Sequence, residues 1–194
     1  MKNIILSTLV LTFVMTSCNK KSEENRTTDS QTESHSKHKE AENKANTEKT
    51  QNVSIQETVS KYLQLKNALV KDDSKGAANA GKELFQTLKG FDTGSIEAKS
   101  KTEYNEIAED AKEHAEHIGE ASGNIVHQRE HFVLLSKDVN DIIELLGTTQ
   151  TLYQEYCPMA NEGKGALWIS ETKEIQNPYY GSKMLDCGSV KKTM

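Results

Sequence analysis

The sequence predicts an all-α dominated fold, an antiparallel four-helix bundle followed by a small, turn-rich C-terminal cap. Three observations support this fold class. Both prolines of the 194-residue chain, Pro158 and Pro178, lie in the final segment, so residues 53–147 contain none. Apolar residues in that proline-free stretch recur at spacings of three and four, which is typical of amphipathic helices. After Gly147 the chain changes to short apolar runs separated by glycines, which favours turns and extended segments.

The first two helices are predicted over residues 53–72 and 75–89. The first has one apolar stripe, made of Ile55, Val59, Tyr62, Leu63, Ala68 and Leu69. The polar run Asp72-Asp73-Ser74 ends it. The second carries its own apolar stripe, and Gly90 and Gly94 flank its exit, where glycine is a common helix stop.

The other two helices are predicted over residues 96–120 and 125–146. Ser122-Gly123-Asn124 forms a turn and a potential cap between them, and Gly147 closes the last helix. Four consecutive helices with short connections make an antiparallel bundle the expected arrangement, over residues 53–148.

Residues 149–194 form the predicted cap. Two short extended segments, around residues 152–156 and 166–169, are separated by Gly163 and Gly165. This spacing predicts a short β-hairpin in the cap. We expect the cap to pack on the bundle.

Residues 1–18 are typical of an export signal. Lys2 supplies a positive start, and residues 4–15 form an apolar run that is too short to span a membrane stably. The run ends in Met15-Thr16-Ser17-Cys18, which resembles the lipobox of bacterial lipoproteins. This resemblance implies cleavage before Cys18, a lipid on Cys18 as the membrane contact, and a protein held in the cell envelope facing the periplasm.

Residues 19–52 contain no aromatic residue and no valine, leucine, isoleucine or methionine. Such a segment buries too little apolar surface to offset the entropy of ordering it, so a disordered polar tether is predicted. The formal net charge is −5, with mixed signs and no basic block in the folded part, so nothing in the composition indicates nucleic-acid binding.

Four sulfur residues in the cap are the first candidate metal ligands: Cys157, Met159, Met184 and Cys187. Cys157 and Met159 are two residues apart, so they share one side of an extended segment, and Met184 and Cys187 are spaced to converge in a turn. Mixed thiolate and thioether ligation favours Cu(I). In an exported protein the two cysteines could instead form a disulfide, which would close a loop of about thirty residues and contribute about 3–4 kcal/mol.

Four of the six histidines, His114, His117, His127 and His131, flank the turn between the last two helices. Each pair shares a helix face, and residues equidistant from the turn lie side by side in an antiparallel hairpin. All four could therefore gather at one end and hold a metal ion. His127 and His131 are the second candidate ligand set. His114 and His117 could equally belong to a solvated polar face with Glu113 and Glu116.

The sequence resembles a bacterial family of unknown-function domains, over residues 55–190. Members occur in lipoproteins and appended to periplasmic adaptor subunits of copper/silver-type heavy-metal efflux systems. The segments that carry the resemblance are residues 62–69, 127–136, 157–160, 165–170, 177–181 and 184–188. The resemblance implies metal handling in the envelope and an efflux adaptor as a partner. The chain lacks the long hairpin and lipoyl-type domains of an adaptor.

No catalytic residue is predicted. The chain has no glycine-rich phosphate loop, nucleophile elbow or HExxH motif. The sequence thus favours an exported lipoprotein that binds a soft metal ion, Cu(I) first, for buffering or for delivery to an efflux system. The alternative is a periplasmic protein-interaction module without metal, stabilised by a Cys157–Cys187 disulfide.

Overall fold

The fold is seen in a computed structural model that describes the backbone of residues 48–194 and the side chains from residue 55 onward. The predicted signal segment with Cys18 and most of the predicted tether lie outside the described residues. His35 and His38 lie outside them as well.

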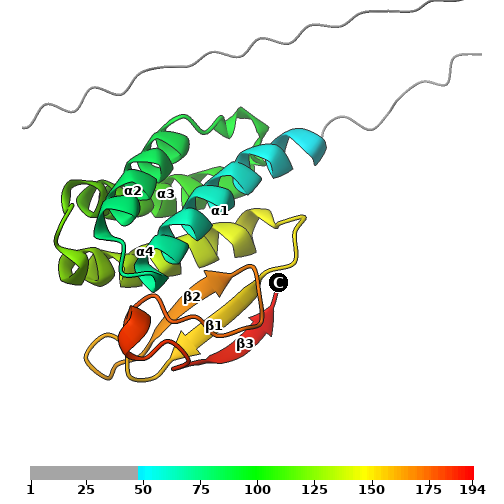
Figure 1. The fold of residues 1–194 in the computed structure, drawn as a ribbon. Helices are drawn as coiled ribbons and strands as arrows, with labels where there is room; N and C mark the ends of the chain where they lie inside the picture. The colour runs from blue at the N-terminus through cyan, green and yellow to red at the C-terminus, as the bar shows by residue number, and fades with distance from the viewer. Residues whose placement is uncertain (1–47) are drawn as a thin grey trace, which may run out of the picture. The chain divides into compact units, whose positions relative to one another are not determined.

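The four predicted helices are confirmed (Figure 1). They are α1 (Glu48–Val70), α2 (Ser74–Lys89), α3 (Ala98–Glu120) and α4 (Ile125–Leu146). Helix α1 begins five residues before the expected start at residue 53, because the polar residues 48–52 continue the helix. A short 3-10 helix, η1 (Thr93–Ser95), precedes α3. Among residues 48–194, none of the helices combines the length and the apolar character needed to cross a membrane.

Local capping explains where α2 and α4 begin and end. The Asp73 side chain accepts a hydrogen bond from the Gly76 backbone amide at 2.9 Å, at the start of α2. The Asn124 side chain accepts one from the His127 amide at 3.3 Å, at the start of α4. Gly147, with φ of 81°, ends α4 in a backbone conformation that glycine adopts without strain.

Small residues allow α2 and α3 to pack closely. Ala77, Gly81 and Ala115 are buried in this contact. A Cβ atom on Gly81 would lie 3.0 Å from the backbone of Ala115 and Gly119, and one on Gly119 would lie 2.8 Å from the Lys82 side chain. Backbone therefore packs directly on backbone here, which sets the position of α3 relative to α2.

The C-terminal cap is a three-stranded antiparallel sheet. Strands β1 (Tyr153–Cys157) and β2 (Ala166–Ser170) form the predicted hairpin, and β3 (Ser189–Thr193) pairs with the other edge of β1, giving the order β2-β1-β3. Strand β3 was not predicted, because its sequence is mostly polar and every one of its residues is exposed. A 3-10 helix, η2 (Gly181–Lys183), lies between β2 and β3.

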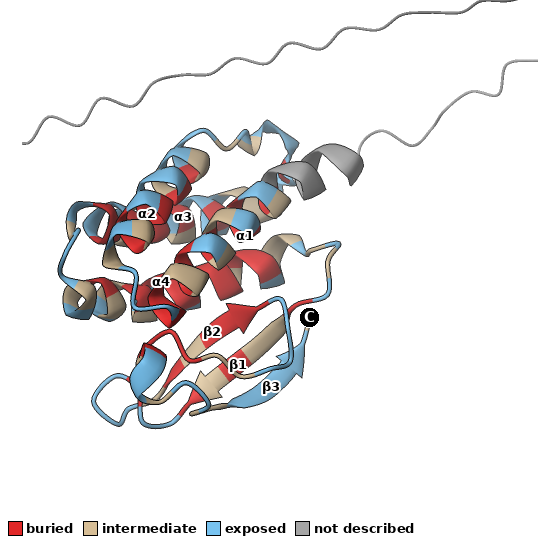
Figure 2. Ribbon diagram, in the orientation of Figure 1, coloured by how far each residue is buried: buried red, intermediate tan, exposed pale blue. Residues whose placement is uncertain are grey.

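The inner face of the sheet packs against the bundle, with β2 next to α4 (Figures 1 and 2). Figure 2 shows the buried residues facing the space between the helices and between α4 and the sheet. At this interface the Tyr62 hydroxyl from α1 lies 2.8 Å from the Ser136 hydroxyl of α4, and it accepts a hydrogen bond from the Ile169 amide of β2 at 3.1 Å. Tyr62 thus joins two helices to the sheet in the buried core.

Arg129 of α4 connects three parts of the fold. Its Nη2 donates to the Leu69 carbonyl at 2.9 Å and to the Asp72 carboxylate at 2.7 Å, and its Nε donates to the Pro178 carbonyl at 2.7 Å. Asp72 also accepts hydrogen bonds from the backbone amide and the hydroxyl of Ser182 in the cap. We call these contacts the Arg129 clamp. It joins the α1–α2 turn, α4 and the cap.

The clamp predicts a loss of stability in acid. Hydrogen bonds from Ser182 and then Arg129 lower the pKa of Asp72 from 3.8 to about 2. The contribution of Asp72 is therefore full above pH 3.8 and is lost as the pH falls toward 2. Because the site is partly exposed, we expect Asp72→Asn to cost only about 1 kcal/mol in urea unfolding at neutral pH. Asp72 has a φ of 57°, a backbone conformation that asparagine also tolerates. An equal loss of stability from Asp72→Asn at pH 2 and at pH 7 would show that the ionised Asp72 carboxylate is not the source of this stability.

Glu155 is a buried carboxylate in the middle of β1. It is completely buried, and within the described structure neither of its carboxylate oxygens has a hydrogen-bond partner. Burial raises its pKa from 4.5 to about 7, against the opposing effects of the Lys66 charge and of the Trp168 indole opposite it on β2. Lys66 is itself buried and pairs with Glu171 at 2.8 Å. Ionisation of Glu155 therefore lowers the free energy of unfolding.

Glu155 changes the stability of the fold with pH in the opposite direction to Asp72. Because the folded pKa of Glu155 is raised, the folded state loses stability as the pH rises from 4.5 through about 7. We expect Glu155→Gln to increase the free energy of unfolding by about 1–3 kcal/mol at pH 8 and by much less at pH 5. Urea denaturation at the two pH values measures this. A Glu155→Gln chain that is less stable at both would show that the carboxylate has a partner after all.

Candidate metal centre

The four histidines of the α3–α4 hairpin gather at one end of it, as their spacing about the turn predicts. His114 and His117 lie on α3, and His127 and His131 lie on α4. The Nδ1 atoms of His114 and His131 are 3.2 Å apart, so one ring donates a hydrogen bond to the other. The ring centroid of His131 lies 4.4 Å from that of His117 and 4.6 Å from that of His127. His131 is thus the central member of the group.

Three of these rings are arranged as potential ligands of one ion. One ring nitrogen from each of His117, His127 and His131 lies within 4.8 Å of the others. The rings are half-buried or exposed at the protein surface, so an ion has direct access to them. We call His117, His127 and His131 the histidine centre. His114 backs it through its contact with His131.

A buried glutamine fixes the hairpin that carries the centre. Gln128 is fully buried, and its amide nitrogen donates to the backbone carbonyls of Ser74 and Ile118 at 2.9 and 3.2 Å. The Ser74 hydroxyl donates to the Gln128 side chain and accepts from the Gly123 amide, both at 2.8 Å. These bonds hold the α3–α4 turn against the start of α2, so that the histidine pairs stay in register.

Carboxylates surround the histidine rings. Glu130 lies 3.1 Å from Nδ1 of His127, and Glu113 lies 3.9 Å from Nε2 of His117. A carboxylate on one ring nitrogen holds the ring and leaves the other nitrogen for a metal ion. With Nδ1 of His127 bound to Glu130 and Nδ1 of His131 facing His114, the Nε2 atoms of both rings are left to act as ligands.

The environment favours neutral imidazoles at two of the four positions. Burial lowers the pKa of His114. Burial also lowers the pKa of His131, and the neighbouring His117, His127 and His114 lower it further by charge repulsion. A neutral ring has a free lone pair, which is the form that binds a metal ion.

The structure brings two of the four predicted sulfur ligands together. Cys157 ends β1 and is completely buried, and its Sγ lies 2.7 Å from Sγ of the partly exposed Cys187. Contact with Cys157 raises the pKa of Cys187 to about 11. Met159 follows in the turn after β1 and is 53% exposed, and Met184 is half-buried after η2. The four-sulfur site stays a prediction.

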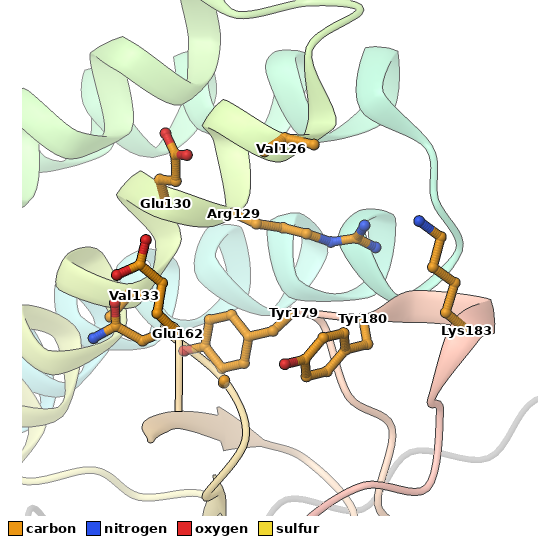
Figure 3. Close-up of a pocket in the computed structure, with 10 residues that line it drawn as sticks. Val126, Arg129, Glu130, Val133, Glu162, Tyr179, Tyr180 and Lys183 are labelled. Atoms are coloured by element: carbon orange, nitrogen blue, oxygen red, sulfur yellow. The ribbon is translucent and has the colours of Figure 1, made fainter. Parts of the chain in front are cut away.

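The histidines and the cap lie on different sides of α4. His127 and His131 face α3, whereas Arg129 and Val133 face the cap across a pocket of about 440 Å³. In Figure 3, Arg129 extends above Tyr179 and Tyr180 toward Lys183, and Glu130 and Glu162 lie at the opposite end. Glu130 belongs to both sides, because it lines the pocket and contacts His127.

Sequence reasoning named His127 and His131 as ligands and left His117 open between a ligand and a solvated residue. The structure places His117 within the centre. His117 and His127 are equally far from the turn, and this spacing indicates that they lie side by side. The adjacent Glu113 and Glu116, however, are also typical of a solvated polar surface. The role of Glu130 was missed, although its i, i+3 spacing from His127 on one helix was a usable signal.

Fold and site together define a helical-bundle protein with a surface histidine cluster and a small β cap. Residues 58–151 match the family described as "Protein of unknown function (DUF3347)". This match supports the coarser part of the resemblance, to an uncharacterised domain family. It covers the histidine centre and ends before β1, so the two cysteines lie outside it. The chain has no significant match among curated proteins, and none among solved structures.

The lowered imidazole pKa values can be measured directly. In metal-free protein, we expect the NMR resonances of His114 and His131 to titrate with midpoints below the ordinary value of 6.5. His114→Ala should move the His131 midpoint upward, because it removes a neighbouring positive charge in acid. A His131 midpoint at or above 6.5 in the unaltered chain would contradict the buried, clustered environment.

Proposed function

We propose that the protein binds a transition-metal ion at the histidine centre, in the cell envelope. The observation that carries the proposal is the approach of three imidazole nitrogens within 4.8 Å on the outside of the α3–α4 hairpin. Nitrogen ligands about 2.0–2.1 Å from a tetrahedral ion lie about 3.4 Å apart. Rotation of the exposed His117 ring and the half-buried His127 ring would therefore complete the site. Water or a fourth residue would fill the remaining position.

Copper is the metal we propose first. Imidazole suits copper, zinc and nickel, and the order of affinities for divalent ions places Cu²⁺ highest. Zinc is the second choice, because it takes the same ligands in tetrahedral geometry. The four-sulfur Cu(I) site predicted from the sequence is the alternative that the titration below tests, because Cys157 and Cys187 lie close together.

The wider context of the proposal comes from the N-terminal sequence and the family resemblance. The lipobox-like segment ending at Cys18 supports a lipid anchor that faces the protein toward the periplasm. A surface site with three imidazole ligands binds an ion reversibly and leaves it accessible. These properties fit buffering of the ion, or its transfer to an adaptor of an efflux system, better than they fit a buried structural metal.

Metal titration of a thiol-free chain separates the two ligand sets. In a Cys18→Ser, Cys157→Ala and Cys187→Ala background, we expect one Cu²⁺ or Zn²⁺ per chain in competition with a chelator. His117→Ala or His131→Ala should lower the affinity at least about tenfold, and the affinity should fall in acid as protons compete with the ion for the imidazoles. The double variant His35→Ala/His38→Ala is the matched control and should bind normally.

Two outcomes would contradict the histidine centre. One is full affinity in the His117→Ala/His131→Ala double variant. The other is loss of binding in the thiol-free chain while the histidine variants with intact thiols still bind, which would assign the ion to the sulfur residues. Circular dichroism of each variant checks that the fold is intact.

A further inference from the structure

Two thiols that are distant in sequence meet at the edge of the cap. Cys157 is the last residue of β1, and Cys187 comes two residues before β3. Since Tyr156 pairs with Ser189 in the antiparallel register, the chain around Cys187 runs alongside Cys157. The two Sγ atoms lie 2.7 Å apart.

The backbone of Cys187 is held in place by its surroundings. The buried Asn177 donates from its side-chain nitrogen to the Cys187 carbonyl at 2.6 Å, and the Cys187 amide donates to the Met184 carbonyl at 3.3 Å. Gly188 follows with φ of 154°, and a Cβ atom there would lie 2.7 Å from the Trp168 ring. Only glycine lets the chain pass this close to Trp168, and this passage keeps Cys187 against β1.

The separation of the sulfurs suits bond formation between them better than shared ligation. Two thiolates bound to one tetrahedral zinc-sized ion, each about 2.3 Å from it, lie about 3.8 Å apart. Sulfurs already in contact need only a small movement to reach the bond length of a disulfide, about 2.05 Å. The two cysteines also differ in access, since Cys157 is completely buried and Cys187 is partly exposed.

We propose that Cys157 and Cys187 form a redox-active dithiol that closes to an intramolecular disulfide, and that Cys187 reacts first. The oxidant is a small-molecule or protein disulfide. Access and not acidity sets this order, because contact with Cys157 raises the pKa of Cys187. Cys187 loses its proton, and its thiolate attacks one sulfur of the oxidant, forms a mixed disulfide and releases one thiolate. The Cys157 thiolate then attacks Sγ of Cys187 and releases the second. Two electrons pass from the cysteine sulfurs to the oxidant, whose two thiolates take up the two protons.

The bond would close a ring that contains much of the cap. Residues 157–187 include β2, η2 and the two tyrosines that line the pocket beside α4. Strand β3, all of whose residues are exposed, begins directly after the ring. Oxidation therefore fastens the start of β3 to the end of β1, and reduction leaves β3 held by its backbone pairing and a few contacts such as Lys192 with Glu144.

The test uses the full chain with Cys18→Ser, so that Cys157 and Cys187 are the only thiols, in the presence of a metal chelator. After equilibration with oxidised glutathione, we expect a monomer that is lighter by two hydrogens and takes up no alkylating label. In the reduced native protein, Cys187 should be labelled well before Cys157. Two labels after oxidation, a stable glutathione adduct or a disulfide-linked dimer would each overturn the proposal.

Single replacements test the order of reaction. Cys157→Ala should trap glutathione on Cys187, because no second thiol displaces it, whereas Cys187→Ala should remain unmodified because Cys157 is buried. Alanine is the mild replacement, since a buried cysteine packs as a small apolar residue. Equal modification of the two variants would overturn the assignment of Cys187 as the reactive thiol.

Thermal unfolding tests the fastening of the cap. A disulfide that closes a loop of this length should raise Tm by on the order of 10 °C relative to the reduced protein. An unchanged Tm would contradict the proposed constraint. None of these measurements involves the histidine centre, so their failure would leave the proposed metal site unaffected.

Discussion

The contacts of Arg129 are the constraint on which the arrangement of the rest of the molecule depends. One guanidinium group meets the last turn of α1, the α1–α2 turn at Asp72 and the cap at Pro178. Since the same helix carries His127 and His131, its rotation about its own axis decides which residues face α3. By holding Arg129 toward the cap, the clamp keeps the two histidines turned toward their partners on α3.

Helix α4 consequently separates two kinds of chemistry. On one side, imidazoles from two helices gather at the protein surface beside carboxylates, and burial lowers the pKa of His131 among them. On the other, a pocket lies between the helix and the cap, lined by two tyrosines, by aliphatic side chains and by the charged Arg129, Glu130, Glu162 and Lys183. Glu130 is shared between the two sides, so a molecule that occupied the pocket and engaged Glu130 would change the hydrogen bonding of His127.

Much of the bundle followed from local sequence. The proline-free stretch with its apolar period, the caps at Asp73 and Asn124 and the stop at Gly147 act within a few residues of each other. The gathering of the histidines was also predictable, because residues at equal distances from a tight turn lie side by side in an antiparallel helical hairpin. The β1–β2 hairpin was predictable for the same reason.

What the sequence could not show depends on partners far apart along the chain. Arg129 and Asp72 are 57 residues apart, and neither has a sequence pattern that indicates the other. Strand β3 lacks an apolar alternation because it is an exposed edge strand. The burial of Glu155 could not be predicted either, because a single glutamate in a short strand usually faces solvent. The contact of Cys157 with Cys187 was one of several open possibilities until the register of β3 was known.

The close packing of Gly81 on Gly119 has a consequence for the histidine centre, which it does not touch. Because neither Gly81 nor Gly119 has a side chain, the backbones of α2 and α3 approach closely there, and this contact sets the distance between the two helices. His114 and His117 are placed by α3, while His127 and His131 are placed by α4. A single methyl group at Gly81 would displace one half of the ligand set relative to the other without altering any ligand. The metal affinity that we propose for the histidine centre should therefore depend on how closely α2 packs against α3.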